Sequence, residues 1–166
     1  MVQVSSGSAK VELPSDEQIL ITREFDAPKE LVFRAYTTPE LVRRWWHAKR
    51  GEMTVAEIDL RPGGKWRFVM VAEGGVEVGF HGEYREVVPN ERIVSTEVFE
   101  GIPDNVYPEN ATVNTATFTD VEGRTRLELL VDAPSKEIRD AIIESGMEAG
   151  LQDALDLLEE LAVSLR

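Results

Sequence analysis

Two histidines, His47 and His81, are the only side chains of this sequence that titrate near neutral pH without help from their surroundings. His81 stands in a stretch of alternating polarity with Glu77, Glu83 and Arg85, and alternate residues of a strand share one face. If that face were internal, His81 and Glu83 could act as acid and base on a bound carbonyl compound. A solvated outer face is the simpler interpretation, and it is the one that we favour.

The patterns of several common catalytic and metal sites are missing from the sequence. It contains no Cys, which excludes a thiol nucleophile, a disulfide and a Cys-ligated metal. It has no His-Glu-x-x-His spacing and no Ser in a Gly-x-Ser-x-Gly turn. The Arg-Pro-Gly-Gly turn at residues 61–64 joins two expected strands rather than opening a helix, so it is no phosphate-binding loop. We therefore expect no metal and no cofactor, and we favour a protein that is not an enzyme.

Residues 43–50 (RRWWHAKR) form the one basic and aromatic cluster of the sequence. Such a cluster could engage a membrane surface, an acidic partner or single-stranded nucleic acid. We favour a structural role, in which one of Trp45 and Trp46 packs under a helix and the other closes the mouth of a cavity. The formal net charge of −13 repels phosphate backbones, so we expect no nucleic-acid partner.

The elements that position these residues are expected to form one α+β domain, because 166 residues with 42% hydrophobic content suit a single core. Residues 1–15 lack a sustained period and are expected to form a flexible tail, with the domain at residues 16–166. The first residues contain no apolar core of a signal peptide, and no stretch approaches eighteen apolar residues. We therefore expect a cytoplasmic protein with no membrane span.

Alternation with a period of two predicts seven strands joined mainly by short turns. Consecutive strands so joined pair antiparallel, and a twisted sheet of this size curls. Two short helices are expected between the first two strands, because Ala27-Pro28 and Thr38-Pro39 are helix start signals. The expected strands are residues 18–25, 53–60, 65–72, 76–88, 91–100, 111–118 and 124–131.

Residues 135–165 carry apolar side chains at steps of three and four, which predicts one long amphipathic helix. About thirty helical residues span roughly 45 Å, so this helix must cross the concave face of the curled sheet. The denser leucine pattern after residue 154 predicts a structural clamp. Gly146 and Gly150 interrupt the first half, which is expected to leave room for a cavity.

This arrangement resembles the helix-grip fold of the START-like (SRPBCC) superfamily, to which the birch-pollen-allergen-like proteins belong. The local sequences look like the branch named for homology to the activator of the heat-shock-protein-90 ATPase, the AHSA family. The terminal helix of that family often reads Gly-Trp, where this chain has Gly150-Leu151. The resemblance rests on FDAPKELVFRAYTTPELVRRWW (25–46), DLRPGGKWRFVM (59–70), GEYREVVPNERIVSTE (82–97) and GMEAGLQDALDLLEELA (146–162).

The resemblance implies a curved antiparallel sheet of six to seven strands wrapped around a long C-terminal helix. It also implies a hydrophobic cavity between them, which the superfamily uses for lipids, polyketides and other apolar molecules. We expect a non-catalytic domain that binds such a ligand, entered past the loop at residues 101–109 and Trp46. The expected lining residues are Trp46, Trp66, Phe68, Met70, Phe80, Phe99, Met147 and Leu151.

Two other functions stay open at this point. One is a polyketide cyclase-like or hydrolase-like enzyme that uses His81 and Glu83. The other is a co-chaperone or stress-related interaction module, which would bind a chaperone or another protein partner as the family's namesake does. A homodimer is compatible with all three, and no feature of the sequence decides it.

Overall fold

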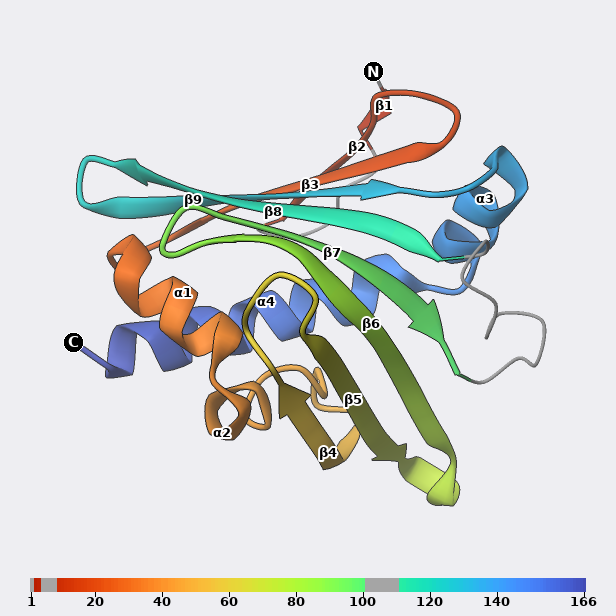
Figure 1. Cartoon of the computed structure of the whole chain (residues 1–166), viewed down its shortest axis with the longest axis horizontal. Coiled ribbons are helices and arrows are strands. Elements are labelled where there is room, and N and C mark those ends of the chain that lie inside the picture. Colours follow the sequence, from red (N-terminus) through yellow and green to blue (C-terminus); the bar gives the residue numbers. More distant parts are fainter. Residues whose placement is uncertain (1, 4–8, 101–110) are drawn as a thin grey trace.

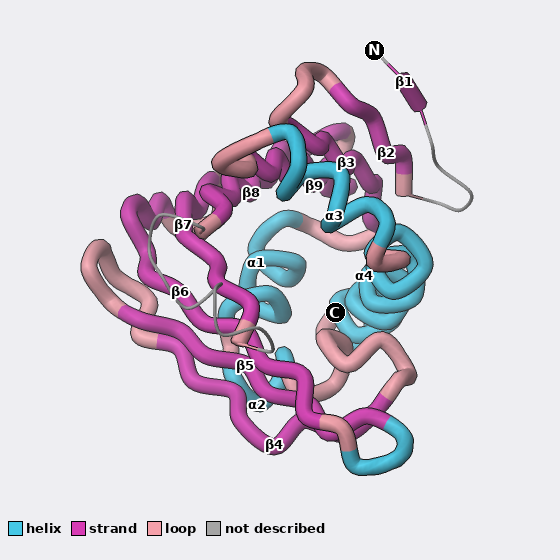
Figure 2. The backbone as a smooth tube through the Cα atoms, turned by 90° about the vertical axis from the view of Figure 1, so that its right-hand side faces the viewer, coloured by secondary structure: helices cyan, strands magenta, loops and turns pink. Residues whose placement is uncertain are grey.

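The computed structural model describes residues 2–3, 9–100 and 111–166, and in this part of the chain nine strands form one sheet (Figure 1). The strand order is β1-β2-β3-β9-β8-β7-β6-β5-β4, and every neighbouring pair is antiparallel. Seen from the side, the strands follow an arc around the helices α1, α2 and α4 (Figure 2). The sheet therefore has a concave face toward the helices and a convex face away from them.

The strands confirm the seven predicted from alternation, β3 to β9, with boundaries shifted by only a few residues. The expected count of six to seven is wrong, because β1 and β2 extend the sheet beyond β3. The bounds are β1 Val2–Gln3, β2 Lys10–Leu13, β3 Gln18–Phe25, β4 Gly51–Ile58, β5 Lys65–Ala72, β6 Glu77–Val88, β7 Arg92–Phe99, β8 Thr112–Val121 and β9 Arg124–Asp132, with a short 3-10 turn at Glu73–Gly75.

The segment around β2 belongs to the sheet, so residues 9–15 do not form the flexible tail that was expected there. Val11 lies opposite Ile21 of β3, and both Ala9 and Val11 are fully buried. The side-chain amide of Gln152 accepts from the backbone N–H of Ala9 at 2.9 Å and donates to its carbonyl at 2.8 Å. This reciprocal pair fastens the start of the described chain to α4.

The two short helices are confirmed as α1, Lys29–Thr37, and α2, Pro39–Val42. The single C-terminal helix is not: the chain forms α3, Lys136–Glu144, and α4, Met147–Ser164. Gly146, which lies between them, has φ of +84°, a left-handed conformation that interrupts the helix and that glycine adopts at little cost. α4 alone crosses the concave face (Figures 1 and 2).

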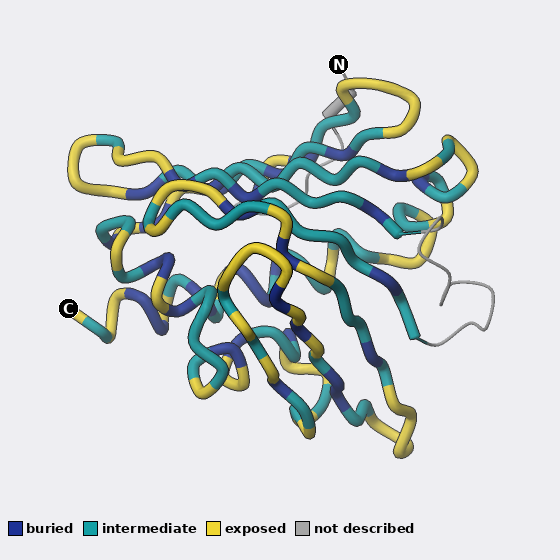
Figure 3. Tube along the Cα trace, in the orientation of Figure 1, coloured by how far each residue is buried: buried dark blue, intermediate teal, exposed yellow. Residues whose placement is uncertain are grey.

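The core lies between the concave face and one side of α4, since buried positions alternate along the strands and recur on that side of the helix (Figure 3). On the sheet, the most deeply buried apolar residues come from β3 and β9. On α4 they are leucines spaced three apart, as one face of a helix requires. Fully or almost fully buried members are Ile19, Ile21, Phe25, Leu127, Leu155, Leu158 and Leu161.

Candidate functional site

The concave face over β5, β6 and β7 carries a group of aromatic rings, here called the aromatic cluster. Strand alternation turns Trp66 and Phe68 of β5, Phe80 of β6 and Phe99 of β7 toward the helices, and Trp46 approaches from the segment after α2. The ring of Trp46 lies 5.6 Å from both Phe68 and Phe80. The Trp66–Phe68 and Phe80–Phe99 distances are 5.0 and 5.1 Å. Five of the eight expected lining residues are therefore linked by a chain of ring contacts.

A hydrogen bond and a glycine hold Trp66 in place. Its indole Nε1 donates to the carbonyl of Thr96 at 3.1 Å, and Trp66 lies opposite Gly82 in the β5–β6 register. A Cβ atom at Gly82 would come within 2.7 Å of that Nε1 and 1.8 Å of the Thr96 oxygen. Only a glycine at this position leaves room for both the indole and the Thr96 carbonyl.

The two neighbouring tryptophans have different surroundings. Trp45 is buried, stacks on Tyr36 at 5.5 Å and donates its indole N–H to the carbonyl of Ala35 at 2.9 Å. Trp46 is partly exposed and belongs to the aromatic cluster. His47, the next residue, accepts a hydrogen bond from the backbone N–H of Lys49 through Nδ1.

The three remaining expected lining residues lie at the ends of their elements. Met70 is buried on β5, opposite Met53 of β4 and Val78 of β6. Met147 begins α4 and Leu151 follows one turn later, and both are partly buried against the core. The loop at residues 101–109, the expected entrance, lies outside the described residues.

The concave face also holds polar side chains that the sequence analysis did not single out, here called the polar cluster: Tyr36, Tyr84, Glu97, Thr112 and Asn114. Glu97 of β7 accepts a hydrogen bond from the Asn114 side chain of β8 at 2.8 Å. The Thr112 hydroxyl donates to the amide oxygen of Asn114 at 3.1 Å. The carboxyl group of Glu97 therefore has a neutral hydrogen-bond partner, Asn114.

Burial dominates the electrostatics of the polar cluster. Burial raises the pKa of Glu97, and this outweighs the lowering by the hydrogen bond from Asn114. Burial first, and then the nearby charge of Glu97, raise the pKa of the Tyr36 hydroxyl. Burial and Tyr36 in turn raise the pKa of Tyr84. All three shifts favour the neutral form of the group.

A signal for the polar cluster was present in the sequence. The alternation that turns Phe99 inward also turns Ile93, Ser95 and Glu97 to the same face of β7. A glutamate in an exposed-looking strand is usually assigned to solvent, and the histidines drew attention elsewhere. The bond to Asn114 depends on the pairing of β7 with β8, which the sequence alone does not display.

His81 and Glu83, the expected catalytic candidates, lie on the convex face of β6, opposite to Phe80. His81 Nδ1 lies 2.8 Å from Glu100, whose carboxylate also binds Arg67 at 2.9 Å. Arg67, and to a smaller extent His81, lower the pKa of Glu100. Glu83 is exposed. The partner of His81 is therefore Glu100 in a surface ion-pair group, away from both clusters.

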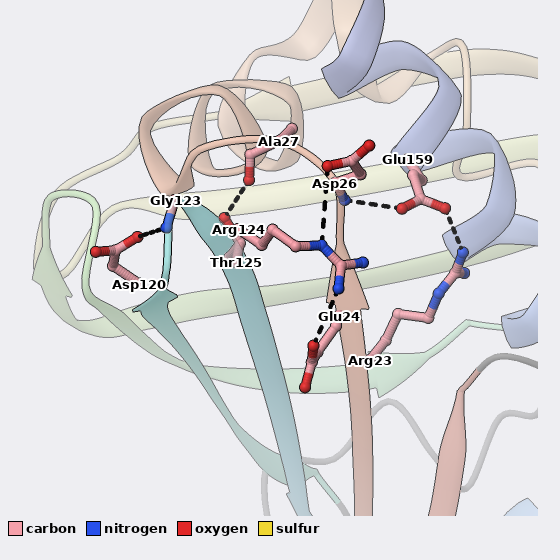
Figure 4. Close-up of polar contacts among 9 residues, drawn as sticks. All are labelled: Arg23, Glu24, Asp26, Ala27, Asp120, Gly123, Arg124, Thr125 and Glu159. Carbon is pink, nitrogen blue, oxygen red and sulfur yellow. Dashed lines mark hydrogen bonds and ion pairs between the residues drawn. The ribbon is translucent and has the colours of Figure 1, made fainter.

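Two shallow hollows of about 370 and 430 Å³ lie away from the aromatic and polar clusters. The first is lined by residues of β7, β8 and the loops around them, including Arg92 and Asp120. The second lies beside β3 and α4, where Arg23 binds Glu159 at 2.8 Å and Arg124 binds Glu24 at 3.4 Å (Figure 4). Its charges already pair with one another, so it offers little to a ligand.

The described residues contain no group of three or more His, Asp or Glu side chains placed to hold a metal ion. Among the helices of this part of the chain, none combines the length and apolar character that crossing a bilayer requires.

The sequence profile of the activator of Hsp90 ATPase homolog 1-like protein family matches residues 26–162. The chain belongs to this family. The match covers every residue of both clusters and confirms the resemblance found in the sequence. No curated protein resembles the chain closely enough in sequence to lend it a function.

Solved structures support the same assignment. A protein from Rhodobacter sphaeroides superimposes with a TM-score of 0.85 and 26% identity, over 94% of this chain and 99% of that one. A Chromobacterium violaceum protein gives 0.73 and 28% identity, over 87% and 96% of the two chains. A Mycobacterium smegmatis protein gives 0.80 and 25%, over 91% and 94%. The architecture of these family-like proteins is therefore shared over nearly their full lengths.

Proposed function

We propose that this family member binds a hydrophobic small molecule, such as a lipid, a polyketide or an aromatic compound, between the concave face of the sheet and α4, without catalysing a reaction. The observation that carries the proposal is the aromatic cluster. Trp46, Phe68, Phe80 and Phe99 face the helices and yet keep part of their surface accessible. Aromatic walls that are inward and incompletely covered are typical of small-molecule sites.

The first half of α4 supports a ligand on this side. A Cβ atom at Gly150 would meet no atom within 4 Å, so the helix is loosely packed at that point. Met147 and Leu151 flank this position, and we propose that they form the wall opposite the aromatic cluster. In this view Trp46 borders the entrance.

The alternatives have less support. An acid–base pair of His81 and Glu83 would act on the convex face, where His81 is already engaged with Glu100. A protein-interaction module would be expected to expose a contiguous apolar patch. Among the described residues, the only exposed large hydrophobic side chains are Val76 and Val163, which come from separate elements.

The test combines native mass spectrometry of the protein purified from cells with a thermal-shift screen of aliphatic and aromatic compounds. We expect a co-purified or added small molecule to raise the melting temperature. Trp46→Ala and Phe80→Ala should reduce that shift, whereas His81→Ala on the convex face should leave it unchanged. A wild-type protein with no bound species and no shift would overturn the proposal, and equal loss in His81→Ala would move the site to the other face.

A further inference from the structure

The polar cluster borders the aromatic cluster on the same side of the sheet. Glu97 and Phe99 are two residues apart on β7, so their side chains stand on one face about 7 Å from each other along the strand. Tyr84 follows Phe80 on the concave side of β6, and Tyr36 of α1 packs edge-on against Phe118 of β8 at 5.5 Å. A ligand against the aromatic rings would therefore reach the polar cluster with one end.

Several hydrogen-bonding atoms of the polar cluster are unused. One oxygen of Glu97 is bonded to Asn114, whose amide oxygen is bonded to Thr112. Within the part of the chain that the structure describes, the second oxygen of Glu97 and the hydroxyls of Tyr36 and Tyr84 have no hydrogen bond. None of these three atoms is completely buried, so each keeps some surface that a ligand oxygen could approach. These atoms can therefore form hydrogen bonds with an oxygen of a ligand.

The charges around this place favour an uncharged ligand. No Lys, Arg or His among the described residues forms an ion pair with Glu97. Arg23, the one cation on the concave side of β3, is held by Asp156 at 2.9 Å and Glu159 at 2.8 Å. A ligand carboxylate would lose its water here without gaining a counter-charge, and it would approach another carboxyl group.

We propose that the polar cluster binds one carbonyl or hydroxyl oxygen of a neutral, otherwise apolar ligand, and that it selects such molecules over the corresponding carboxylates. This inference rests on the proposed function and specifies the chemistry of its ligand. A tyrosine hydroxyl and a protonated carboxyl can each donate or accept, so they suit both a ketone and an alcohol. Burial, which raises the pKa of Glu97, supports the protonated form.

A series of four probes with one ring system tests the selection: naphthalene, 2-naphthol, 2-acetylnaphthalene and 2-naphthoate. Binding is measured at pH 7 by isothermal titration calorimetry on the full chain. We expect the alcohol and the ketone to bind at least about tenfold more tightly than naphthalene and 2-naphthoate, which corresponds to about 1.4 kcal/mol.

Variants then assign the selection to the cluster. Tyr36→Phe and Glu97→Leu should remove most of the advantage of the two oxygen-bearing neutral probes and leave naphthalene binding unchanged. Glu97→Gln, which keeps a neutral hydrogen-bonding group, should retain it. Thr115→Val, on the convex face of β8 beside Asn114, is the matched control and should change nothing. Circular dichroism of each variant verifies that it is folded.

The outcomes separate this inference from the proposed function. If all four probes bind equally, or 2-naphthoate binds best, the inference is overturned while the hydrophobic site stands. If the neutral probes are preferred but Tyr36→Phe and Glu97→Leu keep that preference, the polar cluster is not its source and the inference again fails. Absence of binding by every probe would overturn the inference, and the screen of aliphatic compounds described above would then decide the proposed function.

Discussion

Two halves of the concave face differ in how they meet the helices. The clamp half consists of β2, β3 and β9 with the second half of α4, and its inward side chains, such as Phe25, Leu127 and Leu158, are almost completely buried. The other half, here called the pocket half because we propose the ligand site there, consists of β5, β6, β7 and the adjoining β8 residues of the polar cluster. Several of its inward side chains, such as Phe68, Phe80 and Glu97, keep partial exposure, although Trp66 and Tyr84 are buried. One sheet thus provides stability at one side and accessible surface at the other.

Two inward-facing ionisable residues of the sheet, Arg23 and Glu97, illustrate the same difference. Arg23 in the clamp half binds two carboxylates of α4, and one of them, Glu159, also accepts the backbone N–H of Asp26 at 2.9 Å (Figure 4). Glu97 in the pocket half has only a neutral partner. A charged group that is fully paired within the protein contributes to its stability, whereas one with unused hydrogen-bonding capacity can bind a ligand.

The largest expected effect is that of Leu158→Ala. Leu158 is fully buried in the clamp half, so its truncation should lower the free energy of unfolding by about 2–5 kcal/mol through lost burial and a residual cavity. Leu151→Ala, in the partly exposed first half of α4, should cost distinctly less. Urea denaturation of the two variants measures both, and a reversed ranking would mean that the halves are wrongly assigned.

Replacement of Arg23 tests the polar part of the clamp. Arg23→Met keeps much of the side-chain volume and removes the bonds to Asp156 and Glu159, so we expect a loss of about 1.5–3 kcal/mol in the free energy of unfolding. The control is Arg67→Met, whose half-exposed ion pair with Glu100 lies on the convex face and should contribute less than about 1 kcal/mol. Equal losses in denaturation experiments would show that the Arg23 pairs do not hold α4 in place.

The sequence predicted the clamp half better than the pocket half, because burial there follows periodicity. β3 was expected over residues 18–25 and forms there, since a short run rich in branched residues favours a strand. β2 has only four residues, too few for a period, and its place depends on Gln152. The division between α3 and α4 was missed because apolar spacing continues across Gly146 and only its backbone conformation changes.

In the pocket half, the side-chain types in the sequence predicted the aromatic cluster but not the polar cluster. Phe80 and Phe99 were predicted because aromatic residues on an alternating strand favour the interior. Glu97 shares the inward face of Phe99, but its surroundings come from Asn114 and Tyr36, which lie far away in the sequence. Whether an inward carboxyl group is charged or neutral depends on its partners from other elements of the fold. The local sequence around the carboxyl group does not reveal those partners.

Glu97→Gln should change the pH dependence of stability rather than the fold. Because the pKa of Glu97 is raised above its ordinary value of 4.5 in the folded protein, the unfolded chain releases this proton first. The contribution of Glu97 to wild-type stability is therefore fully present below pH 4.5, and it is lost as the pH rises toward the folded pKa. The variant lacks this loss, so its free energy of unfolding, taken relative to that of wild type, should increase from pH 4 to pH 7.

Urea denaturation at several pH values measures this difference, with Glu83→Gln on the convex face as the control. Titrations shared by both proteins cancel in the comparison with wild type. A Glu97→Gln profile parallel to wild type would mean that Glu97 is solvated as an ordinary surface carboxylate. The distinction between the two inward-facing charges would then disappear.

Met147→Trp has the smallest expected effect on stability and the sharpest on binding. Met147 is partly buried at the start of α4, so a larger ring there should change the free energy of unfolding by less than about 1 kcal/mol. The same ring would fill space opposite the aromatic cluster and should weaken binding of a thermal-shift ligand about tenfold. Val163→Trp, at the exposed end of α4, is the control and should alter neither quantity. A Met147→Trp protein that loses stability but binds normally would assign the first half of α4 to the clamp, and the wall of the site would have to come from the sheet alone.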